Sequence, residues 1–265
     1  GESVRDDLPV WTQIQGLSSG LHGGHLFRQA VFGLSQKVEG LTFFEIDYNP
    51  IAPNPHDNRE TVRDIAGALL TPYGDFFASL DRGYKKVAVL YSRESAHLVS
   101  RKVNRLNYAA EGLWVACLRA GFPADFLYDR QLREGKGLDY EVIFAPGYAY
   151  EDEASPENLA ALKRLVAAGK TVIVERSSKL PIEGVTRLDS ELDEFDDKLG
   201  GAFPRYVDFE TEMVWDQTEE MTKLLRGFLP KKIKPAAEHN LTVGPDWLRR
   251  GQGEYMVLPN FAPTK

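Results

Sequence analysis

The sequence has very little that would tie the chain to a membrane, to an oxidising compartment or to nucleic acid. Cys117 is the only cysteine among 265 residues, so no disulfide can form within the chain. No apolar run approaches the roughly 18 residues that a membrane-spanning helix needs. Lys and Arg number 32 against 39 Asp and Glu, a net charge of -7, whereas phosphate backbones and anionic lipids attract basic faces. We therefore expect no nucleic-acid partner and no membrane partner.

The first residues carry no signal-peptide pattern, because no basic segment is followed by an apolar one. The chain opens with Gly1-Glu2-Ser3 in place of a methionine. A processed or excised segment would have lost any targeting signal. We therefore expect a soluble protein and leave its compartment open.

Strand-like and helix-like patterns alternate through the centre of the chain. Lys85–Ser92 has two charges and then a continuous apolar run, which is typical of a buried parallel strand. Ser155-Pro156-Glu157 combines an N-cap, a proline at the first helical position and an acid near the positive helix end. Further strands are expected at 124–128, 140–145 and 170–175, and a helix at 99–120. The pattern predicts an α/β fold with a parallel sheet covered by helices on both faces.

The two ends of the chain differ from this centre. Residues 8–80 predict a strand, a helix, a strand and a helix, in other words a βαβα segment. From residue 241 short β-like runs appear, and Gly251-Gln252-Gly253 predicts the turn of a hairpin. We therefore expect three parts, with boundaries at 1–82, 83–230 and 231–265, the last being a small β-rich tail.

Ligands of parallel sheets bind beyond the carboxyl ends of the strands. Glu94 and Ser95 follow the central strand, Tyr148 follows the strand at 140–145, and Arg176 follows the strand at 170–175. We predict these four residues as ligand contacts, with the tyrosine suited to stacking on a sugar. An ion pair of Glu94 with Arg93 or Arg176 is an equal alternative.

Ser177 is a weak candidate for a nucleophile. A nucleophile elbow needs a small residue on each side, because the turn is strained and crowded. The sequence Glu175-Arg176-Ser177-Ser178-Lys179 has no glycine there. We favour a capping or polar loop role, and His97, the only histidine of the central part, is the residue to examine as a base.

Glu45 and Asp47 alternate along a strand end, so both carboxylates can face one cavity. Such a pair can serve glycoside hydrolysis, although we favour simple hydrogen bonding. His22, His25 and His56 lie in loops without metal-ligand spacing. We therefore expect no metal and no cofactor, and we interpret Cys117 as a buried apolar residue of a helix.

The order of segments resembles a known family of beta-galactosidases, built from a TIM barrel, a glutamine-amidotransferase-like middle domain and a small β-domain. The resemblance rests on residues 87–95, on 139–146 and on 162–178, with its Ala168–Val174 run. It implies a flavodoxin-like or class I amidotransferase-like domain that is non-catalytic and helps form a trimer. Residues 8–80 resemble the last two β/α units of the barrel, and residues from 241 the start of the β-domain.

Two departures from the family concern activity. Thr12–Gln15 has no acid where the family has its nucleophilic glutamate. Two β/α units cannot close a barrel, which needs eight. In amidotransferase-like domains the strand corresponding to 169–178 delivers a cysteine, and this chain has Arg176, Ser177 and Ser178 instead.

The sequence therefore predicts a non-catalytic structural or assembly domain of a beta-galactosidase-like glycoside hydrolase, forming a homo-oligomer and with a carbohydrate as its expected ligand. Three alternatives stay open. The chain can be part of an active glycosidase, a sugar- or small-molecule-binding module, or a small hydrolase that uses Ser177.

Overall fold

The structure of the chain is a computed structural model that divides into two compact units. One unit consists of residues 1–83 and 245–262, and the other of residues 84–244 and 263–265. The three-part boundaries expected from the sequence stay a prediction. The structure describes residues 11–15, 23–35, 38–44, 59–79, 81–82, 85–93, 103–148, 154–189, 221–234, 246–250 and 253–257.

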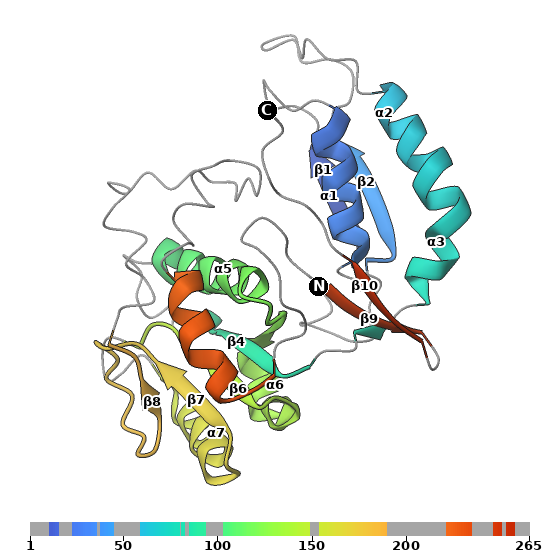
Figure 1. Ribbon diagram of the computed structural model, residues 1–265. Helices are drawn as coiled ribbons and strands as arrows, with labels where there is room; N and C mark the ends of the chain where they lie inside the picture. The colour runs from blue at the N-terminus through green and yellow to red at the C-terminus, as the bar shows by residue number, and fades with distance from the viewer. Residues whose placement is uncertain are drawn as a thin grey trace. The chain divides into compact units, whose positions relative to one another are not determined.

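A five-stranded, wholly parallel sheet forms the centre of the second unit (Figure 1). Its spatial order is β5-β4-β6-β7-β8, which becomes 2-1-3-4-5 when the strands are numbered within the unit. This is the order of flavodoxin-like sheets. The predicted α/β fold is therefore confirmed. The strands are β4 (Val87–Tyr91), β5 (Ala124–Tyr128), β6 (Val142–Phe144), β7 (Thr171–Val174) and β8 (Thr186–Arg187).

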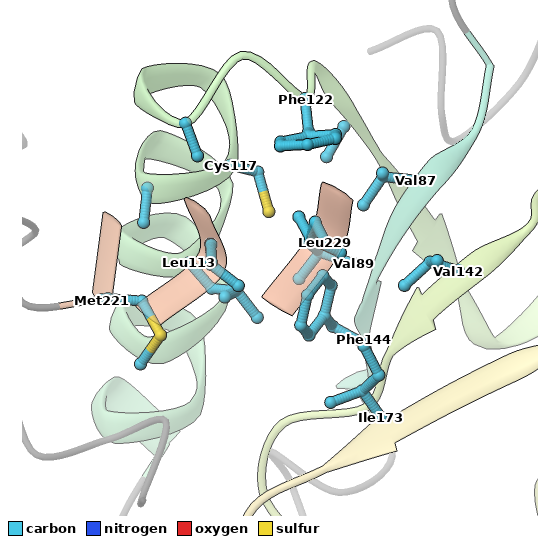
Figure 2. Close-up of a cluster of buried hydrophobic side chains, with 14 of the residues drawn as sticks. Val87, Val89, Leu113, Cys117, Phe122, Val142, Phe144, Ile173, Met221 and Leu229 are labelled. Atoms are coloured by element: carbon cyan, nitrogen blue, oxygen red, sulfur yellow. The ribbon is translucent and has the colours of Figure 1, made fainter. Parts of the chain in front are cut away.

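One face of this sheet packs against α5 (Val103–Arg119) and the helical residues 221–228. Successive side chains of a strand point to opposite faces. Val87 and Val89, which are two residues apart, therefore both lie in the hydrophobic cluster between this face and the helices. Figure 2 shows Leu113 and Cys117 of α5 directed at the sheet strands. Cys117 is fully buried, which raises the pKa of its thiol well above the ordinary value. Its predicted role as an apolar core residue is therefore confirmed.

The opposite face of the sheet packs against α6 (Asp129–Arg133) and α7 (Pro156–Ala167). Ala88 and Leu90, which alternate with the valines of β4, lie in this second cluster. Both faces of β4 are thus covered, and this explains its uninterrupted apolar run.

Helix α7 begins and ends as the sequence predicts. The Ser155 hydroxyl accepts a hydrogen bond from the Asn158 amide at 3.3 Å, and Pro156 takes the first helical position. Gly169 follows the helix with φ of +79°, a left-handed conformation that glycine adopts without a steric penalty. These local signals determine where the helix between β6 and β7 begins and ends.

The first unit contains the predicted βαβα segment. Strand β1 (Trp11–Gln15) pairs in parallel with β2 (Gly40–Phe44), and α1 (Gly23–Ser35) connects them. The second helix is continuous over three pieces, since α2 and α3 flank a π-helical stretch that the sequence does not reveal. Its buried side chains Ile65 and Leu69 pack with residues of β1 and α1. The three pieces are α2 (Arg59–Asp64), η1 (Ile65–Leu70) and α3 (Thr71–Ala78).

The predicted hairpin near the end of the chain is also present. Strand β9 (Asp246–Arg250) pairs with β10 (Gly253–Val257) in antiparallel register. The other edge of β9 pairs with β3 (Asp81–Arg82). The hairpin therefore completes a three-stranded sheet with a strand that follows the βαβα segment.

Candidate functional site

The carboxyl ends of the parallel strands form the candidate site of the second unit. After β4 the chain forms β5 on one side of β4 and then β6 on the other side of β4. The topological switch therefore lies between β4 and β6. Ligands of open α/β sheets bind at such a switch. The described segments at this edge are 91–93 after β4, 128–129 after β5, 145–148 after β6 and 175–180 after β7.

Arg187 of β8 holds the turn that follows β7. Its Nη1 donates to the carbonyl oxygen of Ser178 at 2.6 Å, of Glu175 at 3.1 Å and of Arg176 at 3.3 Å. Hydrogen bonds from a charged donor are stronger than neutral ones. The carbonyl groups of this turn therefore converge on a cation of the protein itself.

The amide groups after Ser177 are also engaged within the protein. The Ser178 amide donates to the Glu175 carbonyl at 3.3 Å, and the Leu180 amide donates to the Ser178 hydroxyl at 3.4 Å. The Lys179 amide donates to the Tyr148 carbonyl at 2.6 Å. An oxyanion hole needs amides directed at the reacting oxygen. Although Ser177 is exposed, this geometry therefore argues against acyl transfer there.

The hydrogen bond from the Lys179 amide joins two of the predicted ligand loops. Tyr148 at the end of β6 has φ of +62° and follows Gly147 with φ of +83°. The tyrosine side chain is fully buried among the residues that face α7. Because stacking on a sugar needs an exposed ring face, this arrangement offers no stacking surface at Tyr148. Its role as a ligand contact stays a prediction.

Arg176 is exposed at the same edge of the sheet. Its Nη1 donates to the carbonyl oxygen of Asp189 at 3.2 Å, so part of the guanidinium binds the chain after β8. Glu94 and Ser95 lie outside the described residues, and the predicted pair between Glu94 and Arg176 stays open.

Several other predicted residues also lie outside the described ranges: Glu45, Asp47, His22, His56 and His97. His25 belongs to α1, and the structure gives no account of its side chain. Within the described ranges, no three His, Cys, Asp or Glu side chains come together in a way that could hold a metal ion. In the same part of the chain, no helix has the length and apolar character to cross a membrane.

The structure brings together polar residues that sequence reasoning missed. Asp129 directly follows β5 and is 7% exposed, and Asn158 in the first turn of α7 is fully buried. The Asn158 Nδ2 donates to Asp129 Oδ1 at 2.7 Å. An acid placed directly after a predicted strand was the available signal for Asp129. Arg187 had none, because its two-residue strand carries no periodicity.

Two tyrosines at this edge were also missed. Tyr91 and Tyr128 are the last residues of β4 and β5 and are register partners. Their ring centroids lie 5.5 Å apart with the ring planes 48° to each other. Both residues are half-buried. The available signal was a tyrosine at the end of the strand predicted at 124–128 and next to the end of the strand predicted at 85–92.

No family model matches the chain, and no curated protein matches it either. Solved structures do match its fold. Gan42B, a GH42 beta-galactosidase from G. stearothermophilus, is similar with a TM-score of 0.59 and 14% identity, over 98% of this chain and 49% of that one. The apo exo-carrageenase GH42 from Bacteroides ovatus is similar with a TM-score of 0.51 and 14% identity, over 95% of this chain and 33% of that one.

These similarities extend over most of the chain, and at 14% identity they concern the fold. The chain spans about half of the length of Gan42B and about a third of the length of the exo-carrageenase.

Proposed function

We propose that this chain is part of a beta-galactosidase-like glycoside hydrolase, in which the flavodoxin-like unit is a non-catalytic structural or assembly domain. The observation that supports this most directly is the similarity to Gan42B over 98% of the chain. A likeness that includes both units is more informative than one limited to the parallel sheet, because flavodoxin-like sheets host many unrelated functions.

The turn after β7 supports a non-catalytic role for the second unit. Amidotransferase-like domains would place a thiol at this turn, whereas the only cysteine here, Cys117, is buried in α5. The contacts of Arg187 with the Glu175, Arg176 and Ser178 carbonyls turn the same loop into a cross-link between β7 and β8. A loop that is held in this way suits a scaffold.

The first unit supports the glycoside-hydrolase part of the proposal. A parallel pair β1–β2 with α1 between the strands and a helix after β2 has the form of two β/α units. A barrel needs eight such units. Residues of a longer protein would therefore supply the missing units, and a nucleophilic acid would have to lie outside Thr12–Gln15, which has none. In such a protein Glu45 and Asp47, which follow β2, are our candidates for sugar contacts.

Hydrolysis of a chromogenic β-galactoside tests the proposal. The 265-residue chain should show no turnover above buffer, while the product of the complete reading frame that encodes it should hydrolyse the substrate. In that product, Ser177→Ala should leave kcat/KM within about twofold, because an exposed side chain that takes no part in the chemistry does not stabilise the transition state. Loss of hydrolysis in the Ser177→Ala variant would show that the second unit is catalytic.

Light scattering after size-exclusion chromatography tests the assembly role. The complete product should elute as a homo-oligomer. A monomer at micromolar concentration, with hydrolysis intact, would contradict an assembly role and leave only a structural one for the second unit.

A further inference from the structure

The turn after β7, residues 175–179, lies beside Arg187 of the neighbouring strand β8. Arg187 is the register partner of Val174, the last residue of β7, so its side chain starts next to the turn. Among the described residues, all hydrogen bonds of this side chain come from Nη1, which donates to the three carbonyl groups of the turn. The edge of the guanidinium formed by Nε and Nη2 is left open by these contacts.

The open edge of the Arg187 guanidinium has the geometry of an oxyanion donor. Its Nε–H and one N–H of Nη2 point in the same direction and match two oxygens of a phosphate or a carboxylate. The carbonyl groups that bind Nη1 hold the guanidinium in place before any ligand arrives. Because little side-chain freedom is then lost on binding, a donor held in this way binds more tightly than a mobile arginine would.

The exposed charges around this edge are mainly positive. Arg176 and Lys179 belong to the turn itself, and both are exposed, as is Arg187. The Arg176 Nη1 donates to the Asp189 carbonyl at 3.2 Å, which keeps its guanidinium near the end of β8. Asp189 is exposed, whereas Glu175 is 1% exposed and presents no charge at the surface. Three exposed cations thus face one exposed carboxylate here, although the chain as a whole carries a net charge of -7.

The remaining acid of the connection from β7 to β8 lies away from the turn. Glu183 precedes Gly184, and a Cβ atom on Gly184 would be 2.9 Å from Cγ1 of Val166. Val166 is in the last turn of α7. Since α7 leads from the carboxyl end of β6 to the start of β7, its last turn lies at the amino edge of the sheet. Glu183 therefore leaves the positive charge at the carboxyl edge uncompensated.

We infer that the Nε–Nη2 edge of Arg187, together with Arg176 and Lys179, forms a binding site for a phosphate group, carried by inorganic phosphate or by a small phosphate monoester. A phosphate monoester carries a charge of about -1.5 to -2 at pH 7 and three acceptor oxygens, which suits three cations better than a carboxylate with one charge does. The turn also follows a parallel strand at its carboxyl end, the edge at which ligands of such sheets bind. The inference does not depend on the proposed function.

Titration of the 265-residue chain with inorganic phosphate, at constant ionic strength, tests the site. In ¹H–¹⁵N spectra the Nε–H signals of Arg187 and Arg176 should shift and saturate with a Kd of about 1 mM or lower, as two or three charge-assisted hydrogen bonds allow. Arg187→Lys keeps the charge but loses the fork, and should weaken binding about tenfold. Arg176→Gln and Lys179→Gln each remove one cation and should weaken it about threefold.

Arg130→Gln is the matched control, because Arg130 is an exposed arginine of α6 that pairs with Glu134. This variant should bind phosphate as the unchanged chain does. Equal shifts with sodium chloride, or equal shifts of the Arg130 signal, would show only general charge screening and overturn the site. Unchanged binding by both Arg187→Lys and Arg176→Gln overturns it as well. If Arg187→Lys does not fold, the signals of the unchanged chain and the Arg176→Gln variant decide.

Glucose 6-phosphate, with glucose as its control, distinguishes the two sources of the phosphate group. An affinity equal to that of inorganic phosphate or higher supports a monoester as the ligand, and glucose alone should cause no shift. Binding of inorganic phosphate without binding of the ester supports the free anion. Absence of saturable shifts with both probes overturns the inference and leaves the proposed function untouched, because hydrolysis by the complete product is measured separately.

Discussion

The Arg187 Nη1 lies 2.6 Å from the carbonyl oxygen of Ser178 and is the closest of three contacts that this nitrogen makes with one turn. In amidotransferase-like domains, which the sequence resembles, the corresponding strand delivers a nucleophile to this turn. In this chain the Arg187 side chain, which comes from the next strand, binds the carbonyl groups of the turn. The contribution of these contacts to the free energy of unfolding can be measured.

Replacing Arg187 with alanine should lower the stability of the second unit. The substitution removes a charged donor that two N–H groups of Nη1 share among three carbonyl oxygens, and a hydrogen bond to a charged group contributes about 1.5–3 kcal/mol net. Because the site is partly exposed to water, we expect a net loss of about 1–3 kcal/mol. Urea unfolding followed by circular dichroism gives the free energy directly.

Arg130→Ala is the matched control for this experiment. Arg130 pairs with Glu134 at 3.4 Å on the surface of α6, with side chains 57% and 47% exposed. Exposed pairs of this kind contribute at most about 1 kcal/mol. Equal losses in the Arg130 and Arg187 variants would show that the turn is not held by the guanidinium.

The buried hydrogen bond between Asn158 and Asp129 predicts a coupling between β5 and α7. Asn158→Ala leaves Asp129, which is 7% exposed, without the donor at 2.7 Å. Losing a hydrogen bond to a charged group costs about 1.5–3 kcal/mol. Asp129→Ala alone should cost a similar amount, and the double variant should cost much less than the sum, because the two residues share one interaction.

The coupling is measured from the unfolding free energies of the four proteins in a double-mutant cycle. An interaction energy of about 1 kcal/mol or more is expected. Additive losses would mean that the two side chains contribute independently, and the contact would then be of no energetic consequence.

The parts of the fold that the sequence predicts are those fixed by local chemistry. The apolar run from Val87 to Leu90 requires cover on both faces, and Ser155 and Gly169 mark the ends of α7 by capping and by positive φ. These features depend on residues near one another in the chain. They can therefore be predicted without knowledge of the tertiary structure.

The site could be predicted only as an edge of the sheet, because its contacts join distant residues. Tyr148 looks like an exposed loop residue in the sequence, yet its ring lies in the core, and its left-handed φ is uncommon for a residue with a side chain. Arg187 reaches the turn only because β8 pairs with β7. Neither fact has a local pattern from which it could be deduced.

The burial of Cys117 predicts how stability changes at alkaline pH. Burial raises the pKa of this thiol in the folded state, so above about pH 8.5 the unfolded chain releases a proton that the folded chain keeps. The contribution of this thiol to the free energy of unfolding is fully present below that pH. Above it, the free energy of unfolding falls by up to about 1.4 kcal/mol per pH unit. Cys117→Ala should abolish this part of the slope.

The comparison of unfolding free energies between pH 8 and pH 10 for the two proteins isolates the thiol, because all other titrating groups are shared. The native thiol should also be inert to iodoacetamide and react only after urea is added. Rapid alkylation of the native protein, or identical pH slopes, would contradict the burial of Cys117.

Gly40 is required because the Trp11 ring lies directly over it on the neighbouring strand. A Cβ atom built on Gly40 would be 2.5 Å from Cδ2 of Trp11, with two further ring carbons at 2.7 Å. Side chains do not tolerate such distances, so Gly40→Ala should force the indole away from the β1–β2 pair. Because the indole is 65% exposed and can rotate away, the cost should be about 1 kcal/mol, at the low end of the range for overpacked cores.

The partner variant distinguishes this clash from a change of backbone preference. Trp11→Ala removes the ring, and since Trp11 is 65% exposed it should cost less than a buried aromatic residue would. In the Trp11→Ala background, Gly40→Ala should be neutral or should stabilise, because alanine restricts the unfolded chain more than glycine does. If Gly40→Ala destabilises both backgrounds equally in thermal unfolding, the ring is not the reason for the glycine, and the parallel pair itself must exclude a side chain there.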